Sequence, residues 1–407
     1  MNKNILFIML GILALINSGC SKEFDDKPAK NDLSPSEIIE HEYVINHPCL
    51  LHTNADFEYV KAKVEAQAEP WYSGWLKLKN NTYSYPNYTP NVPEAFANGN
   101  ADISVAYQHA LIWKITGDEA FAKSSINILN QWAQKCKSIQ DNGILVTAFQ
   151  GYQFANVAEI MRTYSGWAKS DFEAYQKWME KLFLPICYKF LNERTDPIGM
   201  GWISWEATAN LTLFSIAILC DNEEMINYSL DYFYKGGGPG SIQHMIVEMH
   251  EDPAGRLTGK KLGQSIEMGR DQGHAAIAVP ILGAYCQSAY NIGIDLFAYD
   301  DNKVLALCEY YAKYNVKPNE PVIMPFTRYY TSKDGGKWQE EVSSTGRGES
   351  RPGWELIYNH YAKIKKVETP YSGDFAEKMR PEGGYTDYSM GGKGDQFGFG
   401  TLMYSRD

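Results

Sequence analysis

Ionisable side chains crowd one apolar stretch of the chain, residues 264–290 (QSIEMGRDQGHAAIAVPILGAYCQSAY). If the stretch is one helix, Glu267, then Arg270 or Asp271, then His274 recur at i, i+3 or i+4, and i+7, and so share one side. Burying such groups unpaired is expensive, so they must face each other, solvent or a ligand. The spacing alone fits an ion-paired helix end as well as a catalytic site.

The same stretch begins within GQSIEMGRDQGHAAIAV, and NIGIDLF (291–297) and EYYAKYN (309–315) follow it. This order of motifs resembles the alginate-lyase family of polysaccharide lyases, which has the pattern G-Q-x-x-E-x-x-R-D-Q-x-H, then G-I-D-L, then E-Y-x-A-K-Y-N. Segments at 107–118, 150–156 and 351–361 extend the resemblance over residues 45–400. Several motifs in one order are far more specific than any one of them. The resemblance implies an all-α fold, an incomplete (α/α) toroid whose inner helices line a cleft.

The activity implied by the resemblance is β-elimination on a polyuronide. The C6 carboxylate must be neutralised, a base must take the C5 proton, and an acid must protonate the departing O4. The resemblance implies that His274 acts as base or as neutraliser, and Arg270 can add positive charge. It also implies a catalytic tyrosine after the 309–315 helix, where we favour Tyr329 over Tyr330. No metal and no organic cofactor is required.

Other tyrosines are less favoured for this role, namely Tyr152 and Tyr311. A phenol with a pKa near 10 serves as base or acid when nearby cations lower that pKa.

Candidate substrate-binding residues lie on three further segments. Gln272 could hydrogen-bond a sugar. Tyr152, Gln153 and Asn156 belong to the 150–156 motif, and a polar edge of Tyr152, Asn156, Glu159 and Thr163 could face the cleft. Family members open a later helix with Asn-Trp, and alignment on Cys220-Asp221-Asn222 places Ser204-Trp205 there. Serine has no amide, so the carboxylate would rely more on His274 and on arginine.

Two arginines, Arg347 and Arg351, lie on the Gly-rich segment 346–351 and could fork onto carboxylates. They matter because the net charge of −11 would repel a polyanion unless the cleft is locally basic. Further cations are Arg256, Lys260 and Lys261. The acidic balance also argues against nucleic acid as a partner.

Two rival functions are compatible with the same residues. A glycoside hydrolase on this toroid would use two of Glu159, Glu206, Glu267, Asp271 and Glu355 as acid and base. An inactive polysaccharide-binding lipoprotein is the non-enzymatic alternative, which Ser204 in place of asparagine favours.

The N-terminus is typical of an exported protein. Lys3, the apolar run 5–16 and Ser18-Gly19-Cys20 form a signal peptide over residues 1–20, and Cys20 matches the lipidated cysteine of bacterial lipoproteins. Residues 21–33 are polar and charged, as expected of a tether. We therefore expect a protein anchored by lipid to the outer membrane, at its surface or periplasmic face, with no other membrane contact. The other six cysteines show no zinc-site spacing.

Residues 34–407 are expected to form one helical domain that positions these groups. Apolar spacing and capping signals predict helices near 34, 53–66, 103–116, 119–136, 147–164, 170–191, 204–219, 223–234, 264–290, 303–314 and 354–363. Strand-like alternation is scarce before the last forty residues. This pattern favours an all-α array.

Overall fold

The computed structural model describes residues 40–97, 99, 101–140, 144–192, 202–331, 336–388 and 394–407. The predicted signal peptide, tether and helix start at Ser34 lie outside these residues. Helices dominate, and their bounds are α1 (Asn54–Glu65), α2 (Trp71–Lys79), α3 (Asp102–Thr116), α4 (Glu119–Lys135), α5 (Ile144–Met161), α6 (Lys169–Leu182), α7 (Leu184–Asn192), α8 (Ile203–Leu219), α9 (Glu223–Lys235), α10 (Gln272–Asn291), α11 (Tyr299–Asn315), α12 (Trp354–Tyr358), α13 (Pro370–Met379) and α14 (Gly400–Tyr404).

The described strands are short and occur as three pairs. They are β1 (Ala95–Phe96) with β2 (Ser138–Ile139), β3 (Ile246–Glu251) with β4 (Lys260–Ser265), and β5 (Tyr329–Thr331) with β6 (Lys337–Gln339). The first pair is parallel and the other two are antiparallel.

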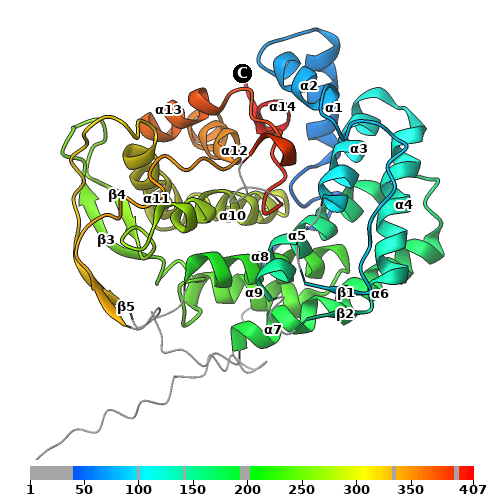
Figure 1. Cartoon of the computed structure of the whole chain (residues 1–407), viewed down its shortest axis with the longest axis horizontal. Coiled ribbons are helices and arrows are strands. Elements are labelled where there is room, and N and C mark those ends of the chain that lie inside the picture. The colour runs from blue at the N-terminus through cyan, green and yellow to red at the C-terminus, as the bar shows by residue number, and fades with distance from the viewer. Residues whose placement is uncertain are drawn as a thin grey trace, which may run out of the picture.

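The helices pack as consecutive pairs around a ring. Pairs form between α1 and α2, α3 and α4, α5 and α6, α8 and α9, α10 and α11, and α12 and α13. The first members, α1, α3, α5, α8, α10 and α12, contact one another in that order. Figure 1 shows the resulting curved array, which runs from α1 through α5 and α8 to α12 and α13. The predicted (α/α) toroid is confirmed.

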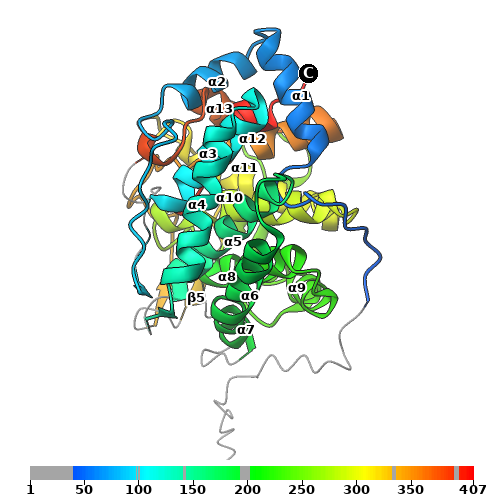
Figure 2. The same cartoon turned by 90° about the vertical axis from the view of Figure 1, so that its right-hand side faces the viewer.

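The two ends of the array meet through the C-terminal helix. α14 contacts α1, α2 and α12, and both views place α1, α2 and α13 at the same end of the molecule (Figures 1 and 2). The Trp71 Nε1 donates to the Ser405 carbonyl at 3.2 Å. Gly74 is required here, because a Cβ at that position would lie 2.7 Å from the Leu402 nitrogen.

Inner helices are buried along almost their whole length. Every residue of α8 except Trp205 is buried, and in α10 only Gly273, His274, Tyr290 and Asn291 are not. A helix that is apolar all round must be covered all round. In α8 and α10, solvent therefore reaches little more than the helix ends. His274 lies at the N-terminal end of α10, and Trp205 lies at the N-terminal end of α8.

The helix predicted over 264–290 is wrong in its first third. Gln264 and Ser265 end strand β4 and pair with Glu248 and Ile246 of β3. The chain then turns, and α10 begins only at Gln272. Asp271 caps it, because its side chain accepts the His274 backbone N–H. The expected helical face of Glu267, Arg270, Asp271 and His274 therefore does not exist. Arg270 and His274 nevertheless both lie beside Asp271.

Other boundaries differ for local reasons. The helix predicted over 170–191 is interrupted at Phe183, because Pro185 in the first turn of α7 lacks the N–H that a continuous helix needs. The predicted strand character at the C-terminus is reduced, in the described residues, to one bridge between Gly384 and Gly398. Among the described helices, none is both long enough and apolar enough to cross a membrane.

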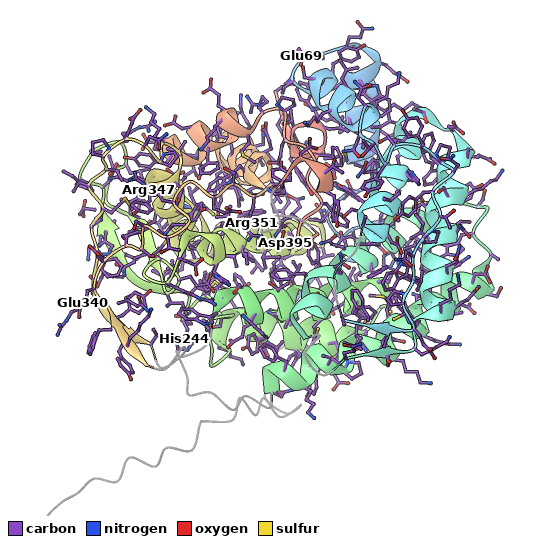
Figure 3. All side chains as sticks on the ribbon, in the orientation of Figure 1. Glu69, His244, Glu340, Arg347, Arg351 and Asp395 are labelled. Carbon is purple, nitrogen blue, oxygen red and sulfur yellow. The ribbon has the colours of Figure 1, made fainter. Side chains whose placement is uncertain are left out.

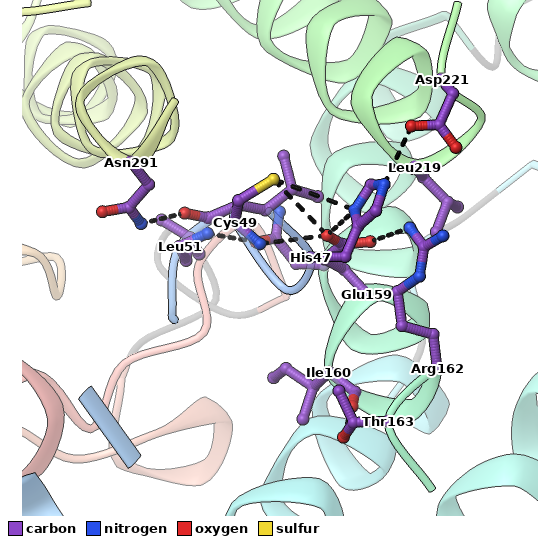
Figure 4. Close-up of polar contacts among 12 residues, drawn as sticks. His47, Cys49, Leu51, Glu159, Ile160, Arg162, Thr163, Leu219, Asp221 and Asn291 are labelled. Atoms are coloured by element: carbon purple, nitrogen blue, oxygen red, sulfur yellow. Dashed lines mark hydrogen bonds and ion pairs between the residues drawn. The ribbon is translucent and has the colours of Figure 1, made fainter. Parts of the chain in front are cut away.

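An extended N-terminal segment, residues 40–51, ties three helix pairs together. The Val44 N–H donates to the Ile292 carbonyl after α10. His47 Nδ1 lies 2.5 Å from Glu159 Oε1 on α5, and its Nε2 lies 2.9 Å from Asp221 Oδ1 after α8. Figure 4 shows His47 held between these two carboxylates, with Arg162 on the far side of Glu159.

This segment corrects the expectation for the polar edge of α5. Glu159 accepts the Cys49 backbone N–H at 3.0 Å, and Asn156 accepts that of Leu51 at 3.0 Å. Both side chains are buried. The edge satisfies the backbone of the 40–51 segment and does not face a cleft.

We predict that His47 stabilises the fold most strongly at acidic pH. Burial of the ring acts to lower its pKa, but the Glu159 and Asp221 carboxylates outweigh burial and raise the pKa above 6.5. A raised folded-state pKa gives stability that is complete below about pH 6.5 and is lost as pH rises through the folded-state value. His47→Gln should therefore lower Tm more at pH 6 than at pH 9. An equal loss at both pH values would contradict this linkage.

Candidate active site

The turn before α10 and the start of α8 meet at one end of the inner helices. Glu267 Oε1 accepts hydrogen bonds from the Ser204 N–H at 3.1 Å and from the Ser204 hydroxyl at 3.0 Å. Arg270 stacks on the buried Trp202 ring, with its guanidinium carbon 4.4 Å from the ring centroid. These contacts bring Arg270, His274, Ser204 and the half-buried Trp205 into one neighbourhood.

His274 is oriented by the residue that caps its helix. Asp271 Oδ1 accepts the His274 N–H at 2.8 Å, and Asp271 Oδ2 lies 2.7 Å from His274 Nδ1. A carboxylate only accepts hydrogen bonds, so the neutral imidazole carries its proton on Nδ1 and has its lone pair on Nε2. The His274 side chain is 43% exposed. The geometry therefore gives an oriented imidazole that is accessible from outside the protein.

Arg270 supplies a fixed positive charge next to this pair. Its Nε lies 3.7 Å from Asp271 Oδ2, and its side chain is 17% exposed. Stacking on Trp202 holds the guanidinium by a cation–π contact that an ammonium could not reproduce in the same planar form. Such a group can contribute to neutralising a substrate carboxylate.

Ser204 and Glu267 form a buried polar pair below this surface. Both are less than 2% exposed. Burial raises the pKa of Glu267 to about 7, against the hydrogen bonds from Ser204 and the charge of Arg270. Ser204 therefore points its hydroxyl into the protein. Its expected role in holding a substrate carboxylate would require it to leave Glu267, whereas Trp205 remains partly exposed.

The two candidate tyrosines of β5 point to opposite faces of the β5–β6 hairpin. The Tyr329 hydroxyl donates to the Ile266 carbonyl at 2.6 Å and accepts the Gly269 N–H at 3.1 Å. Burial raises the Tyr329 pKa above its ordinary value. Tyr330 is 48% exposed. Tyr329 thus holds the turn that carries Arg270, and Tyr330 is the more accessible phenol.

Other predicted substrate contacts are occupied inside the protein. The Gln272 amide donates to the Met268 and Ser343 carbonyls, and its oxygen accepts from Asn315. Tyr152 donates to the Asp395 carbonyl at 3.1 Å, and Gln153 donates to the Gly394 carbonyl at 3.0 Å. Tyr311 donates to the Glu349 carbonyl at 2.8 Å. All of these side chains are buried, so they position the chain segments around the site.

The arginine-rich segment is also used structurally. Arg347 stacks on Tyr314 and donates to the Tyr314 and Glu320 carbonyls. Arg351 is 5% exposed, pairs with Asp395 and donates to the Gly273 carbonyl at 3.1 Å. Figure 3 shows Arg351 and Asp395 side by side near the centre of the ring and Arg347 farther out. The expectation that both arginines bind substrate is not matched by this geometry.

The remaining predicted cations also lie beside carboxylates. Arg256 pairs with Asp374, Lys260 lies near Glu248, and Lys261 pairs with Asp301.

We predict that Arg351→Ala acts on stability and not through screened substrate binding. Removing one partner of a buried ion pair leaves an uncompensated charge, which costs about 3–5 kcal/mol. Chemical denaturation should show this loss with little dependence on salt. The double variant Arg351→Met/Asp395→Asn is the control, because it leaves no buried charge and should recover much of the loss. Normal stability with binding weakened only at low salt would restore the substrate role.

The carboxylates required by the rival hydrolase do not form an open pair. Glu206 accepts from the Tyr232 hydroxyl and the Gly240 N–H. Glu355 pairs with Arg380 and accepts from Thr401. Glu159 belongs to the His47 network, and Glu267 to Ser204. Each of these four glutamates is at most 3% exposed. Asp271 is more accessible, but it has no exposed partner carboxylate among them.

One cluster has the composition of a metal site, and sequence spacing did not reveal it. Ligand atoms of His47, Cys49 and Glu159 lie within 4.8 Å of one another (Figure 4). Residue 159 is 110 positions from residue 49, so no local motif could have indicated the cluster. Glu159 already pairs with His47 and with Arg162 at 2.9 Å. A neutralised carboxylate beside an arginine is poorly suited to bind a cation, and we interpret the cluster as an ion-pair network.

A hollow lies at the far end of α10 from His274. It has a volume of about 760 Å³ and is lined by the 40–46 segment, α9 and Tyr290–Gly293. Glu40, Glu42 and Glu223 line it, and these carboxylates would repel a polyanion. The hollow is therefore an unsuitable cleft for an acidic sugar chain.

Comparisons with known proteins agree with this fold. The family model described as alginate lyase matches residues 52–321. The chain therefore belongs to the alginate lyase family, and it is a polysaccharide lyase. Among curated protein sequences, none matches the chain.

Solved structures show the same architecture at low identity. Alginate lyase A1-III from Sphingomonas species A1 is 11% identical with a TM-score of 0.55, covering 89% of this chain and 100% of that one. A tyrosine-to-phenylalanine variant of alginate lyase A1-III, complexed with a tetrasaccharide, is 12% identical with a TM-score of 0.55, covering 89% and 99%. An alginate lyase from Bacteroides ovatus is 10% identical with a TM-score of 0.53, covering 89% and 100%.

Proposed function

We propose that the protein depolymerises an acidic, uronate-containing polysaccharide, such as alginate or glucuronan, by β-elimination. The observation that carries this proposal is the Asp271–His274 pair at the exposed end of α10, within a chain of the alginate lyase family. The tetrasaccharide complex of the A1-III variant supports a sugar chain as ligand of this fold.

His274 Nε2 would be the base that removes the C5 proton. The electron pair of the C5–H bond forms the C4=C5 double bond, and the C4–O4 bond breaks. Asp271 stabilises the imidazolium that results, because its carboxylate already accepts the Nδ1 proton. Arg270 would face the C6 carboxylate and reduce the negative charge that opposes proton removal. No step needs a cofactor.

A tyrosine of β5 would donate the proton to O4. A phenol that stays neutral suits an acid, and burial keeps Tyr329 neutral. Its proton is engaged by the Ile266 carbonyl, whereas the Tyr330 hydroxyl lies on an exposed residue. The two assignments differ in their consequences. Loss of the Tyr329 hydroxyl should also loosen the turn at Gly269, and loss of the Tyr330 hydroxyl should not.

The proposed activity predicts a new ultraviolet absorbance when the protein is incubated with its polyuronide, because each cleavage creates an unsaturated uronate. A panel of polyuronides and neutral glycans tests this. Reducing ends without the absorbance would indicate hydrolysis, and affinity without products would indicate a binding protein. Either result would contradict the lyase proposal.

His274→Ala is the matched active-site variant. Loss of a positioned base costs about a hundred- to ten-thousand-fold in kcat, while fold and affinity should be retained because His274 is an exposed side chain. Tyr329→Phe and Tyr330→Phe should be compared beside it. The catalytic phenol is the one whose loss lowers kcat. For Tyr329→Phe a lower Tm should accompany that loss, because the Tyr329 hydroxyl also holds the turn at Gly269. Full activity in all three variants would exclude this mechanism.

We also propose that the protein is lipid-anchored through Cys20, at the surface or periplasmic face of the outer membrane. The apolar run 5–16 and Ser18-Gly19-Cys20 support this location. The wild type should partition with membranes, and Cys20→Ala should release it. Recovery of the wild type outside the membrane fraction with an unmodified N-terminus would contradict lipidation.

A further inference from the structure

The β5–β6 hairpin has two faces of different character. Tyr330 and Trp338 are paired across the strands, and their rings lie 5.8 Å apart. They are 48% and 51% exposed. Side chains two positions away share their face, so Arg328 and Glu340 lie on it as well. On the other face Tyr329 contacts the 266–269 turn, and Thr331 and Gln339 are buried. The hairpin thus carries an exposed pair of aromatic rings on one face, and its other face packs against the loop that carries the candidate catalytic residues.

Arg328 adds a cation to this surface. Its guanidinium carbon lies 4.7 Å from the Trp338 ring centroid, and its side chain is 65% exposed. Glu340 Oε1 lies 3.9 Å from Arg328 Nη1, a distance typical of a weak, solvated pair. Figure 3 shows Glu340 at the outer edge of the molecule. We name the exposed set Arg328, Tyr330 and Trp338 the aromatic platform.

The platform is joined rigidly to the candidate active site. Besides the Tyr329 contacts, the Ser343 N–H donates to the Met268 carbonyl at 2.9 Å, and the Gln272 N–H donates to the Thr345 carbonyl at 2.8 Å. A Cβ on Gly269 would lie 2.7 Å from the Gln339 Cβ, so the hairpin and the turn are in close contact. These bonds hold both sides of the hairpin against the 266–272 segment.

We propose that the aromatic platform is a subsite that binds sugar units of the acidic polysaccharide away from the bond being cleaved. This inference rests on the proposed function for the identity of its ligand. It also requires Tyr329 as the phenol that protonates O4, because Tyr330 lies on the hairpin face opposite the 266–269 turn. The apolar faces of sugar rings stack on exposed Trp and Tyr, which combine a flat apolar surface with a polar edge. Arg328 provides the fork that matches a uronate carboxylate. The combination selects a charged sugar chain over a neutral one.

A role in hairpin stability is the alternative. Cross-strand aromatic pairs stabilise hairpins modestly, and such a role predicts a lower Tm with no dependence on substrate length. A subsite predicts an unchanged Tm and an effect that depends on substrate length, because only chains long enough to reach the platform bind to it.

The test compares Trp338→Ala, Trp338→Phe and Ile323→Ala. Ile323 is 78% exposed on the connection that leads to β5 and serves as the control for deleting surface apolar area. We expect Trp338→Ala to raise KM for the long polyuronide by roughly three- to tenfold, the size of one aromatic contact. Values for the shortest oligomer that the wild type cleaves should change little. Trp338→Phe should recover part of the loss, and Ile323→Ala should match the wild type.

Charge gives an independent readout. Arg328→Ala should weaken binding of the polyuronide to the His274→Ala variant, most at low salt. Glu340→Gln should strengthen it, because it removes the carboxylate that competes for Arg328. A platform that only stabilises the hairpin predicts neither change.

Binding and turnover separate this inference from the proposed function. If the wild type binds polyuronide without cleaving it, and Trp338→Ala weakens that binding, the platform holds and the lyase assignment fails. If cleavage is normal and Trp338→Ala changes neither KM nor affinity, the lyase assignment holds and the platform is overturned. Failure to bind any acidic polysaccharide overturns the platform, as does a wild-type dimer in light scattering that Trp338→Ala dissociates.

Discussion

The Asp271 carboxylate is the single group on which the site depends. One oxygen caps α10 by accepting the His274 N–H, and the other fixes the imidazole through Nδ1. The cap decides where the helix begins, and hence that His274 stands in the first turn, where Gly273 and His274 are not buried. A residue one position earlier or later would point elsewhere, because successive helical positions are separated by a large rotation. The start of α10, the tautomer of His274 and the exposure of His274 therefore all follow from the Asp271 side chain.

Much of the fold could be predicted because its helices are separated by clear signals. Thr53 and Asp56 form a capping box at the predicted start of α1, and Gly117 ends α3 in the left-handed conformation that glycine favours. The β3–β4 hairpin was missed because Gln264 and Ser265 continue into apolar residues that also suit a helix. Asp271 followed by Gln272 and His274 is a readable N-cap, yet the longer apolar run concealed it.

Site residues were harder to predict than helices because sequence does not reveal what a polar side chain contacts. Gln272, Arg347 and Arg351 have the chemistry of substrate ligands, but each satisfies backbone carbonyls that the fold would otherwise leave unpaired. His274 and Arg270 were predicted to share one helical face. In the structure they are adjacent because both side chains lie beside Asp271. Trp202 and Trp338 carried no positional signal, because stacking partners are set by tertiary contacts.

Because the chain has a net charge of −11, few of its surfaces could attract a polyanion. Arg256, Lys261 and Arg351 are each paired with a carboxylate, so a broad basic surface is not the device. The N-terminal ends of α8 and α10 adjoin through Glu267 and Ser204, and helix N-termini carry partial positive charge. Arg270, fixed on Trp202, adds a full charge there. In the proposed mechanism this single cation would face the carboxylate of one sugar unit, which suits local elimination better than tight binding along the chain. In the proposed platform, affinity for the rest of the polymer would come from the exposed rings of Tyr330 and Trp338 together with Arg328, all held on the hairpin that packs against the same loop.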